Sequence, residues 1–154
     1  MKRLYSFTLS VFILFFGLSF SAQAARREDV RKIIEIMHSD STKGILERKH
    51  YEEGGVRVVF VAEGKRYTFY HTGDGSINFL SVWVRPNGTA DPKLVETFSD
   101  FNPDGNIDFA IAGQSGDSPL IRKPYDRNSP DNQNLTHWQN KYDKAINHGI
   151  KKLF

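Results

Sequence analysis

The sequence predicts an α+β protein: an antiparallel meander sheet of five or six strands packed by an N-terminal and a C-terminal helix. Apolar residues recur at helical spacing near both ends of the chain, and they alternate with polar residues through its middle. Short turns rich in glycine separate the alternating segments. Connections this short join antiparallel neighbours, because a parallel pair needs a long crossover.

The two helices are predicted from apolar stripes. Residues 26–38 place apolar side chains at positions i, i+3, i+4 and i+7, namely Val30, Ile33, Ile34 and Met37. Near the other end of the chain, Ser129 suits a helix N-cap and Pro130 suits the first helical position. A long terminal helix is expected to follow, with an apolar stripe formed by Leu135, Trp138, Tyr142, Ala145, Ile146, Ile150 and Leu153.

Six segments between the helices are predicted as strands: residues 45–52, 56–62, 65–71, 76–85, 94–101 and 106–112. The first is the weakest, since it is heavily charged. The fourth carries apolar residues on both faces, so the sheet needs cover on both sides from the helices, from curling of the strands or from a partner. Residues 113–128 are polar and rich in Gly, Ser and Pro, which predicts a loop.

The first 24 residues have the pattern of a cleaved signal peptide. Lys2 and Arg3 precede the apolar run of residues 11–18, and Ala22 and Ala24 are the small residues that a signal peptidase needs. We expect cleavage after Ala24, a single mature α+β domain over residues 25–154, a secreted or periplasmic location and no stable membrane anchor after cleavage. The chain has no Cys, which excludes disulfides, thiol catalysis and Cys-ligated metals.

The formal net charge of +3 hides an uneven distribution. Residues 1–24 hold two basic residues and no acid, so the remaining chain has 19 basic and 18 acidic residues, a net charge of +1. Residues 94–118 hold five acids and no Lys or Arg, whereas residues 119–154 hold seven basic and three acidic residues. The near-neutral total argues against a nucleic-acid partner, and the acidic segment marks a place for a cation.

The acidic segment contains the one motif with chemical content. Residues 100–108 follow the pattern D-x-N-x-D-G-x-x-D, in which oxygen ligands can converge on one hard cation. Ca²⁺ is the expected ion, because it accepts roughly six to eight oxygen ligands in irregular geometry. The predicted ligands are Asp100, Asn102, Asp104, Asn106 (through its backbone carbonyl) and Asp108.

These nine residues resemble the calcium-binding loops of EF-hands and dockerins and the aspartate-rich loops of some β-propeller repeats. The resemblance implies a calcium site and extends over the loop alone. It departs from the EF-hand pattern at position 12, where Ile111 replaces a bidentate Glu, and the flanks are predicted as strands. A shorter loop of the type found in β-rich proteins fits better, with water or a distant carboxylate completing the ligand set.

A plain hairpin explains part of the same segment. Pro103 and Asp104 suit the central positions of a type I turn, and Gly105 suits a left-handed bulge. Asp100 and Asp108 are not explained by the turn, because acids that face one another on paired strands repel. Both interpretations stay open at this point.

Other candidate chemistry is weaker. His71, Asp74 and Ser76 lie near a strand end and could supply a base with an orienting group. Ser115 lies in a segment that lacks the last glycine of a nucleophile elbow. The remaining histidines show no spacing typical of a zinc site: His38, His50, His137 and His148.

A set of aromatic residues in the strands could form a carbohydrate or peptide platform, although most of the rings are expected in the core. The set consists of Phe60, Tyr67, Phe69, Tyr70, Phe79, Trp83 and Phe98.

These observations favour a small exported binding or structural protein with a calcium-binding loop and no assembled catalytic set, acting on a protein or glycan partner. A binding role is therefore favoured over an enzyme. The first alternative is a secreted or periplasmic hydrolase, with or without metal assistance, built on the loop acids or on His71 with Asp74. The second is an inhibitor or immunity-type protein that offers the Asp-rich loop to a basic target.

Overall fold

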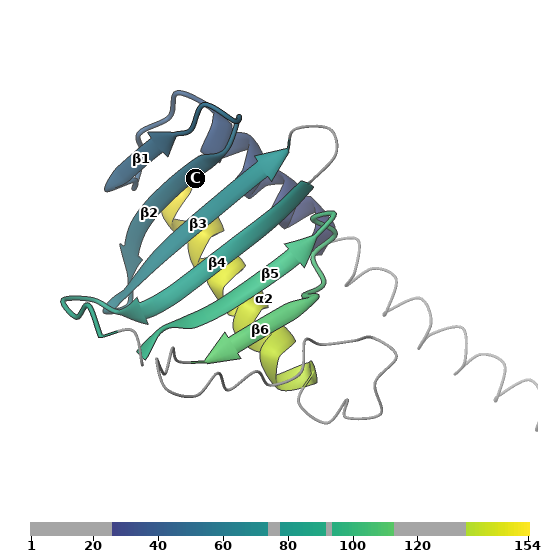
Figure 1. Cartoon of the computed structure of the whole chain (residues 1–154). Coiled ribbons are helices and arrows are strands. Elements are labelled where there is room, and N and C mark those ends of the chain that lie inside the picture. The colour runs from purple at the N-terminus through teal and green to yellow at the C-terminus, as the bar shows by residue number, and fades with distance from the viewer. Residues whose placement is uncertain (1–25, 74–77, 92–93, 113–134) are drawn as a thin grey trace, which may run out of the picture.

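The computed structural model describes residues 26–73, 78–91, 94–112 and 135–154. The predicted meander is confirmed. Six strands form one open sheet in the order β1-β2-β3-β4-β5-β6, and each strand is antiparallel to the next (Figure 1). The strands are β1 (Glu47–His50), β2 (Val56–Ala62), β3 (Lys65–Gly73), β4 (Asn78–Pro86), β5 (Glu96–Phe101) and β6 (Phe109–Ala112).

Two helices accompany the sheet. Residues 26–38 are helical, as predicted, and α2 spans Leu135–Leu153. The predicted cap of the second helix at Ser129 and Pro130 lies outside the described residues, as does the predicted loop over residues 113–128. In Figure 1, α2 passes behind the sheet, where it contacts β2 and β4. Within the described ranges, no helix is both long and apolar enough to cross a membrane.

The strands are shorter than predicted where turns compete for the backbone. β1 covers only the middle of the predicted segment 45–52, because Tyr51 exchanges backbone hydrogen bonds with Gly55 and Gly54 and so closes a turn. β6 begins at Phe109, since residues 102–108 form the loop that joins it to β5.

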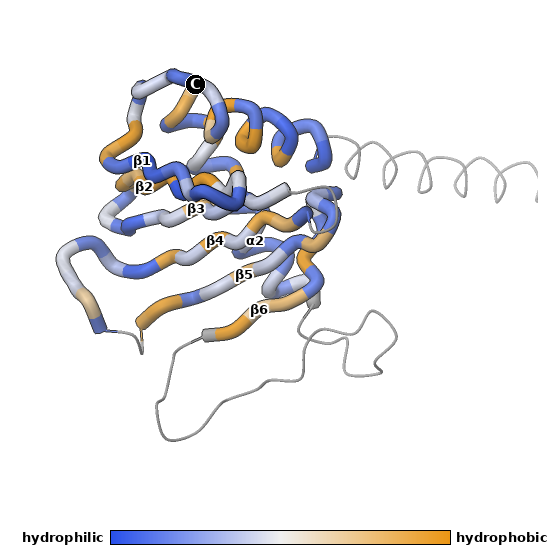
Figure 2. Tube along the Cα trace, turned by 45° about the horizontal axis from the view of Figure 1, so that its top comes forward, coloured by the Kyte–Doolittle hydropathy of each residue, from blue (hydrophilic) through white to orange (hydrophobic). Residues whose placement is uncertain are grey.

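A single core cluster joins the described elements. Residues 26–38 contribute Val30, Ile33 and Met37, and the hydropathy colours of this helix alternate in Figure 2 as expected for an amphipathic helix. Gly149 of α2 lies so close to this helix that an added Cβ would be 2.7 Å from Cδ1 of Ile33 and 3.0 Å from Cε2 of Phe69. A glycine at this position therefore lets α2 approach both elements.

The buried residues of the strands alternate along the chain, so that one face of the sheet forms the core. We call this face the covered face. Its fully buried side chains include Val58, Phe60, Phe69, Leu80, Val82 and Phe98. The residues between them point to the opposite side, which we call the open face, since in the described ranges no helix lies over it (Figure 1).

Candidate functional site

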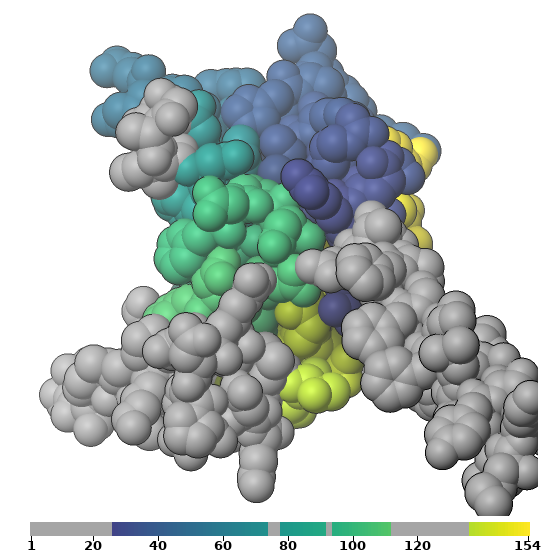
Figure 3. Space-filling model, turned by 90° about the vertical axis from the view of Figure 1, so that its right-hand side faces the viewer, coloured from purple at the N-terminus to yellow at the C-terminus, as the bar shows by residue number. Residues whose placement is uncertain are grey.

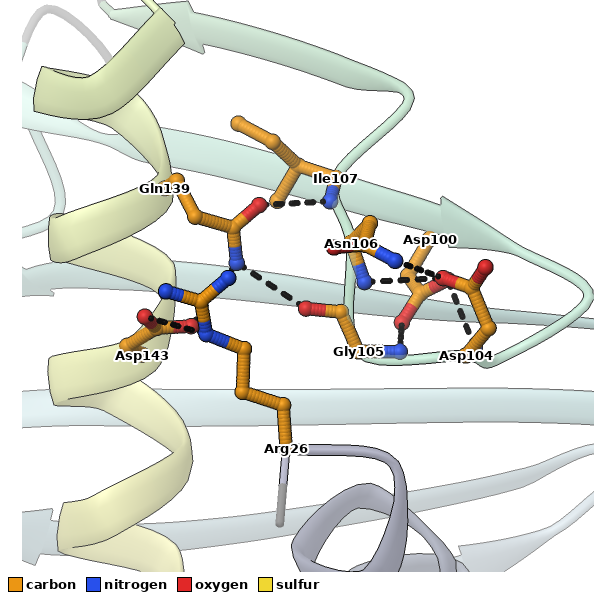
Figure 4. A network of polar contacts seen from close by, with 8 residues as sticks. All are labelled: Arg26, Asp100, Asp104, Gly105, Asn106, Ile107, Gln139 and Asp143. Carbon is orange, nitrogen blue, oxygen red and sulfur yellow. Dashed lines mark hydrogen bonds and ion pairs between the residues drawn. The ribbon is translucent and has the colours of Figure 1, made fainter. Parts of the chain in front are cut away.

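Asp100 is the centre of the Asp-rich loop, and it lies on the covered face with no exposed surface. Its Oδ1 accepts a hydrogen bond from the backbone N–H of Asp104 at 3.1 Å. Its Oδ2 accepts hydrogen bonds from the backbone N–H of Gly105 at 2.9 Å and from the hydroxyl of Tyr142 at 3.0 Å. Both carboxyl oxygens thus hold the turn (Figure 4), and the hydrogen bond from Tyr142 attaches Asp100 to α2.

The surroundings of Asp100 oppose its ionisation. Burial raises the pKa of Asp100 to about 6, and the nearby charge of Asp104 acts in the same direction. The three hydrogen-bond donors lower the pKa but do not compensate for the loss of water. Burial and the proximity of Asp100 raise the pKa of Tyr142 well above its ordinary value, so this hydroxyl remains a donor.

The remaining polar side chains of the loop also act on the backbone. Oδ1 of Asp104 accepts hydrogen bonds from the backbone N and the Nδ2 of Asn106, both at 2.9 Å. Oδ2 of Asp108 accepts a hydrogen bond from the backbone N–H of Phe101 at 2.6 Å. Asn102 is exposed and has a positive φ of 63°, a conformation that Asn tolerates.

Gln139 of α2 joins the loop to the helix, a role that no local sequence pattern indicates. Its Oε1 accepts from the backbone N–H of Ile107 at 3.1 Å, and its Nε2 donates to the carbonyl of Gly105 at 2.9 Å. The same Nε2 lies 2.7 Å from Oδ1 of Asp143, which forms an ion pair with Arg26 at 3.0 Å. In Figure 3 the green loop region, the purple start of the first helix and the start of α2 meet on this side of the molecule.

The structure thus brings the predicted ligands Asp100, Asp104 and Asp108 into one loop. There, their carboxylates accept hydrogen bonds from N–H and O–H groups of the protein itself. The acid whose charge acts on Asp100 is Asp104 and not Asp108, for which repulsion was expected. In the described ranges, no group of three or more His, Asp or Glu side chains is arranged to hold a metal ion. Calcium binding stays a prediction, and a cation at Asp100 would have to compete with its three donors.

A second polar site connects the first helix with the sheet. Nε2 of His38 lies 2.9 Å from Nδ1 of His71, and Nε2 of His71 lies 2.9 Å from Oδ1 of Asn78. Because the Asn78 oxygen accepts, Nε2 of His71 carries a proton and its Nδ1 accepts one from His38. Burial lowers the pKa of both histidines, which keeps the pair neutral.

The histidine pair was not predicted, because its members are 33 positions apart in the sequence. The partners proposed for His71, namely Asp74 and Ser76, lie outside the described residues, as does Ser115. On the covered face, Leu80 lies between His71 and Asp100 in the strand register. The two groups considered for a hydrolase are therefore separated by an apolar side chain.

The aromatic set divides between the two faces of the sheet. Four of its seven members are buried in the core cluster, as expected: Phe60, Tyr67, Phe69 and Phe98. The other three lie half-buried on the open face: Tyr70, Phe79 and Trp83.

These three rings extend into a continuous row by contact with two further residues, Tyr51 and Phe101. Tyr70 contacts Tyr51, Phe79 and Trp83, with ring centroids 5.6, 5.8 and 6.4 Å apart, and Phe79 contacts Phe101 at 6.3 Å. Phe101 is 53% exposed. The row therefore reaches from the turn after β1 to the end of β5, and we call these five residues the aromatic row.

Small hydroxyl side chains lie inside this row. The strand register places Ser81 next to Ser99, with Tyr70 on the β3 side of the pair. The two hydroxyls are 3.1 Å apart, and both serines are buried although they belong to the open face. Large neighbouring side chains therefore shield a small polar centre.

The charges of the open face are predominantly positive. Its strand positions carry one acid, Glu47, and four basic residues: Lys49, Arg57, Arg66 and Arg85. Glu47 forms ion pairs with Arg57 and, at 3.5 Å, with Arg66. Lys49 lies 4.9 Å from the centre of the Tyr51 ring, a cation–π contact. The face thus combines partly exposed rings with an excess of positive charge.

Comparison of the chain with family models, with curated proteins and with solved structures finds no match.

Proposed function

We propose that this is a small exported binding protein that docks a folded protein partner on the open face of its sheet. The observation that carries the proposal is the aromatic row, which extends from the turn after β1 across β3, β4 and β5 with no helix of the described ranges over it. Tyr, Trp and Arg are the residues that dominate the affinity of protein interfaces. A buried structural role would instead place these rings in the core, as it does for Phe69 and Phe98.

The geometry of the row favours a protein over a glycan. Sugars stack on flat aromatic surfaces, whereas the rings of Tyr70 and Phe79 are inclined to one another by 51°, and those of Phe79 and Phe101 by 67°. The surface is also uneven, because the small buried side chains of Ser81 and Ser99 lie among the large rings. An uneven surface of this kind complements side chains of a folded partner.

The charge of the open face specifies the partner further. Arg85 forms no ion pair with another described residue, and Glu47 is the only acid to offset four basic side chains on the strands of this face. We infer that the partner presents acidic residues around an apolar centre. The Asp-rich loop would serve as a structural latch and would not contact the partner, because Asp100 is buried.

The two helices are proposed to share the covered face and to leave the other face for the partner. Support comes from the Arg26–Asp143 ion pair and from the close approach of Ile33 to Gly149. Arg48 also donates a hydrogen bond at 2.8 Å to the carbonyl of Ile36, which attaches the end of the first helix to β1. Export follows from the signal-peptide pattern, and N-terminal sequencing of the secreted protein should begin at Ala25.

Calcium binding by the loop is retained as a separate proposal, with structural stability as its role. Calorimetric titration of EDTA-treated protein should show Ca²⁺ binding in roughly the 10⁻⁴–10⁻³ M range, and Asp104→Ala should abolish it. No heat and no rise in melting temperature at millimolar Ca²⁺ would exclude the site. The docking proposal does not depend on this result.

Site-specific photo-cross-linking tests the docking proposal. A photoreactive phenylalanine is introduced at Phe101 or, as a matched control, at Phe154, which is exposed to a similar degree (53% and 49%). Phe154 follows α2 and is remote from the aromatic row in sequence. Irradiation of the exported fraction should give a discrete protein adduct at position 101 and none at position 154.

The partner in the adduct is then identified, purified without the cross-link and tested for binding to variants of this protein. Arg85→Glu should weaken its binding in low salt, and Lys43→Glu, a charge reversal at an exposed loop residue, should not. Equal adducts at positions 101 and 154 would contradict docking at the open face. Retention of an acidic polysaccharide in place of a protein would contradict the assignment of a protein partner.

A further inference from the structure

The covered side of the molecule contains a groove that the proposed docking face does not use. It has a volume of about 260 Å³ and lies between α2 and the strands β3 to β5. Tyr67, Val84 and Phe98 line it from the sheet, and Lys141, Lys144 and Ala145 line it from the helix. For comparison, an apolar cavity of about 150 Å³ is large enough to bind benzene.

Tyr67 supplies a fixed hydrogen-bond donor to the groove. The residue is 3% exposed, and its ring is held between Phe60, at 5.0 Å and nearly parallel, and His148 at 5.4 Å. Among the described residues, none forms a hydrogen bond with its hydroxyl. Burial and the nearby charges of Glu63 and Glu96 raise the pKa of Tyr67, so the hydroxyl keeps its proton at neutral pH.

The rim of the groove has an excess of free positive charge. Lys141 is committed to Glu96 by a hydrogen-bonded ion pair, and Glu63 lies 3.5 Å from Nε2 of His148. Lys65 and Lys144 line the same groove and form no ion pair with other described residues. An anion entering the groove would therefore find unpaired donors next to an apolar floor.

We propose that this groove binds a small carboxylate with an apolar body. The carboxylate would accept a hydrogen bond from the Tyr67 hydroxyl and pair with the ammonium group of Lys144. The apolar body would lie on Val84 and Ala145, which line the groove from the sheet and from the helix, and its burial there contributes the hydrophobic part of the affinity. This site is on the opposite side of the sheet from the aromatic row, so a test of it is independent of the docking proposal.

Benzoate is the test ligand, since it combines one carboxylate with one apolar ring. Two-dimensional NMR titration of the isotopically labelled protein should show saturable shifts at the groove residues, with a Kd on the order of millimolar for a ligand of this size. Acetate, which lacks the ring, and benzyl alcohol, which lacks the charge, should each bind at least about tenfold more weakly. Equal affinities for all three compounds would overturn the proposal, as would unsaturable shifts.

Variants locate the binding. Tyr67→Phe keeps the ring stack and removes only the hydroxyl, and Lys144→Gln removes an exposed charge, so both should fold. Each should raise the Kd of benzoate by about tenfold, the loss expected for one hydrogen bond to a charged group. Lys151→Gln, an exposed lysine of α2 outside the groove, is the matched control and should leave the Kd unchanged. An equal effect of the two lysine variants would overturn the assignment.

Discussion

Phe98 and Phe101 belong to the same strand, β5, but lie on opposite faces of the sheet. Phe98 has no exposed surface and its ring contacts Trp138 and Tyr142 of α2. Phe101 is 53% exposed and contacts only Phe79 among the described rings. The comparison shows that a half-exposed aromatic residue adds little to the core. The other four rings of the aromatic row are partly exposed as well, and a partner on the open face would bury all five.

The largest predicted effect separates these two phenylalanines. Phe98→Ala removes a ring from the closed core and should lower the free energy of unfolding by about 3–5 kcal/mol. Phe101→Ala should lower it by less than about 1 kcal/mol, because the ring is already hydrated. Urea denaturation of both variants provides the measurement. Similar losses at both positions would show that the open face belongs to the core.

The second prediction concerns the pH dependence of the covered face. The pKa of Asp100 rises from 3.8 to about 6 on folding, so the folded protein binds a proton more tightly than the unfolded chain. Its contribution to stability is full below about pH 4 and is lost as the pH rises through about 6. The wild type should lose about 3 kcal/mol over this range relative to Asp100→Asn.

Urea denaturation at intervals between about pH 4 and pH 7 gives this difference. His38 and His71 have lowered pKa values, so their contribution is lost as the pH falls below their ordinary value of 6.5, in the opposite direction. Because both proteins retain this pair, it cancels in the difference. A difference that does not change with pH would show that Asp100 is not buried.

A third prediction concerns Gly149, on the covered face. Gly149→Ala gains about 1 kcal/mol of helix propensity, but the new Cβ would meet Ile33 and Phe69 at 2.7 and 3.0 Å. Overpacking of a closed core costs about 1–3 kcal/mol, so a net loss of stability is expected. Thermal denaturation measures it. A variant more stable than the wild type would mean that the first helix can shift away from Gly149 at little cost, and that the contact is not tightly packed.

The smallest predicted effect is at Gly55, on the open face. An alanine Cβ there would lie 2.6 Å from the hydroxyl of Tyr70 and 3.0 Å from two of its ring atoms, so this partly exposed side chain would have to move. Stability should change by less than about 0.5 kcal/mol, whereas displacement of Tyr70 should weaken partner binding. A large loss of stability with unchanged binding would reverse the roles assigned to the two faces.

Local patterns were sufficient to predict the six strands, their order and both helices. The alternation of Tyr67 and Phe69, which are buried, with the less buried Arg66, Thr68 and Tyr70, and the short glycine turns, predict an antiparallel meander without long-range information. The ends of the strands were less predictable, because turn bonds such as that of Tyr51 with Gly55 compete with the ladder.

The sites depended on contacts that no local pattern records. Asp100 was recognised as unusual, but its donors include Tyr142, which is 42 positions away, and Gln139 gave no signal at all. The same applies to the pairing of His38 with His71. The division of the aromatic set required knowledge of which face α2 covers, and alternation alone does not decide this.

The most direct test of the docking claim is the affinity of the purified partner for two alanine variants. Phe101→Ala removes a ring of the aromatic row, and Phe154→Ala removes a similarly exposed ring elsewhere. Isothermal titration should show a Kd at least about fivefold weaker for Phe101→Ala, as expected for loss of more than about 1 kcal/mol at an interface residue, and no change for Phe154→Ala. Wild-type affinity in Phe101→Ala, or an equal loss in both variants, would contradict docking on the open face.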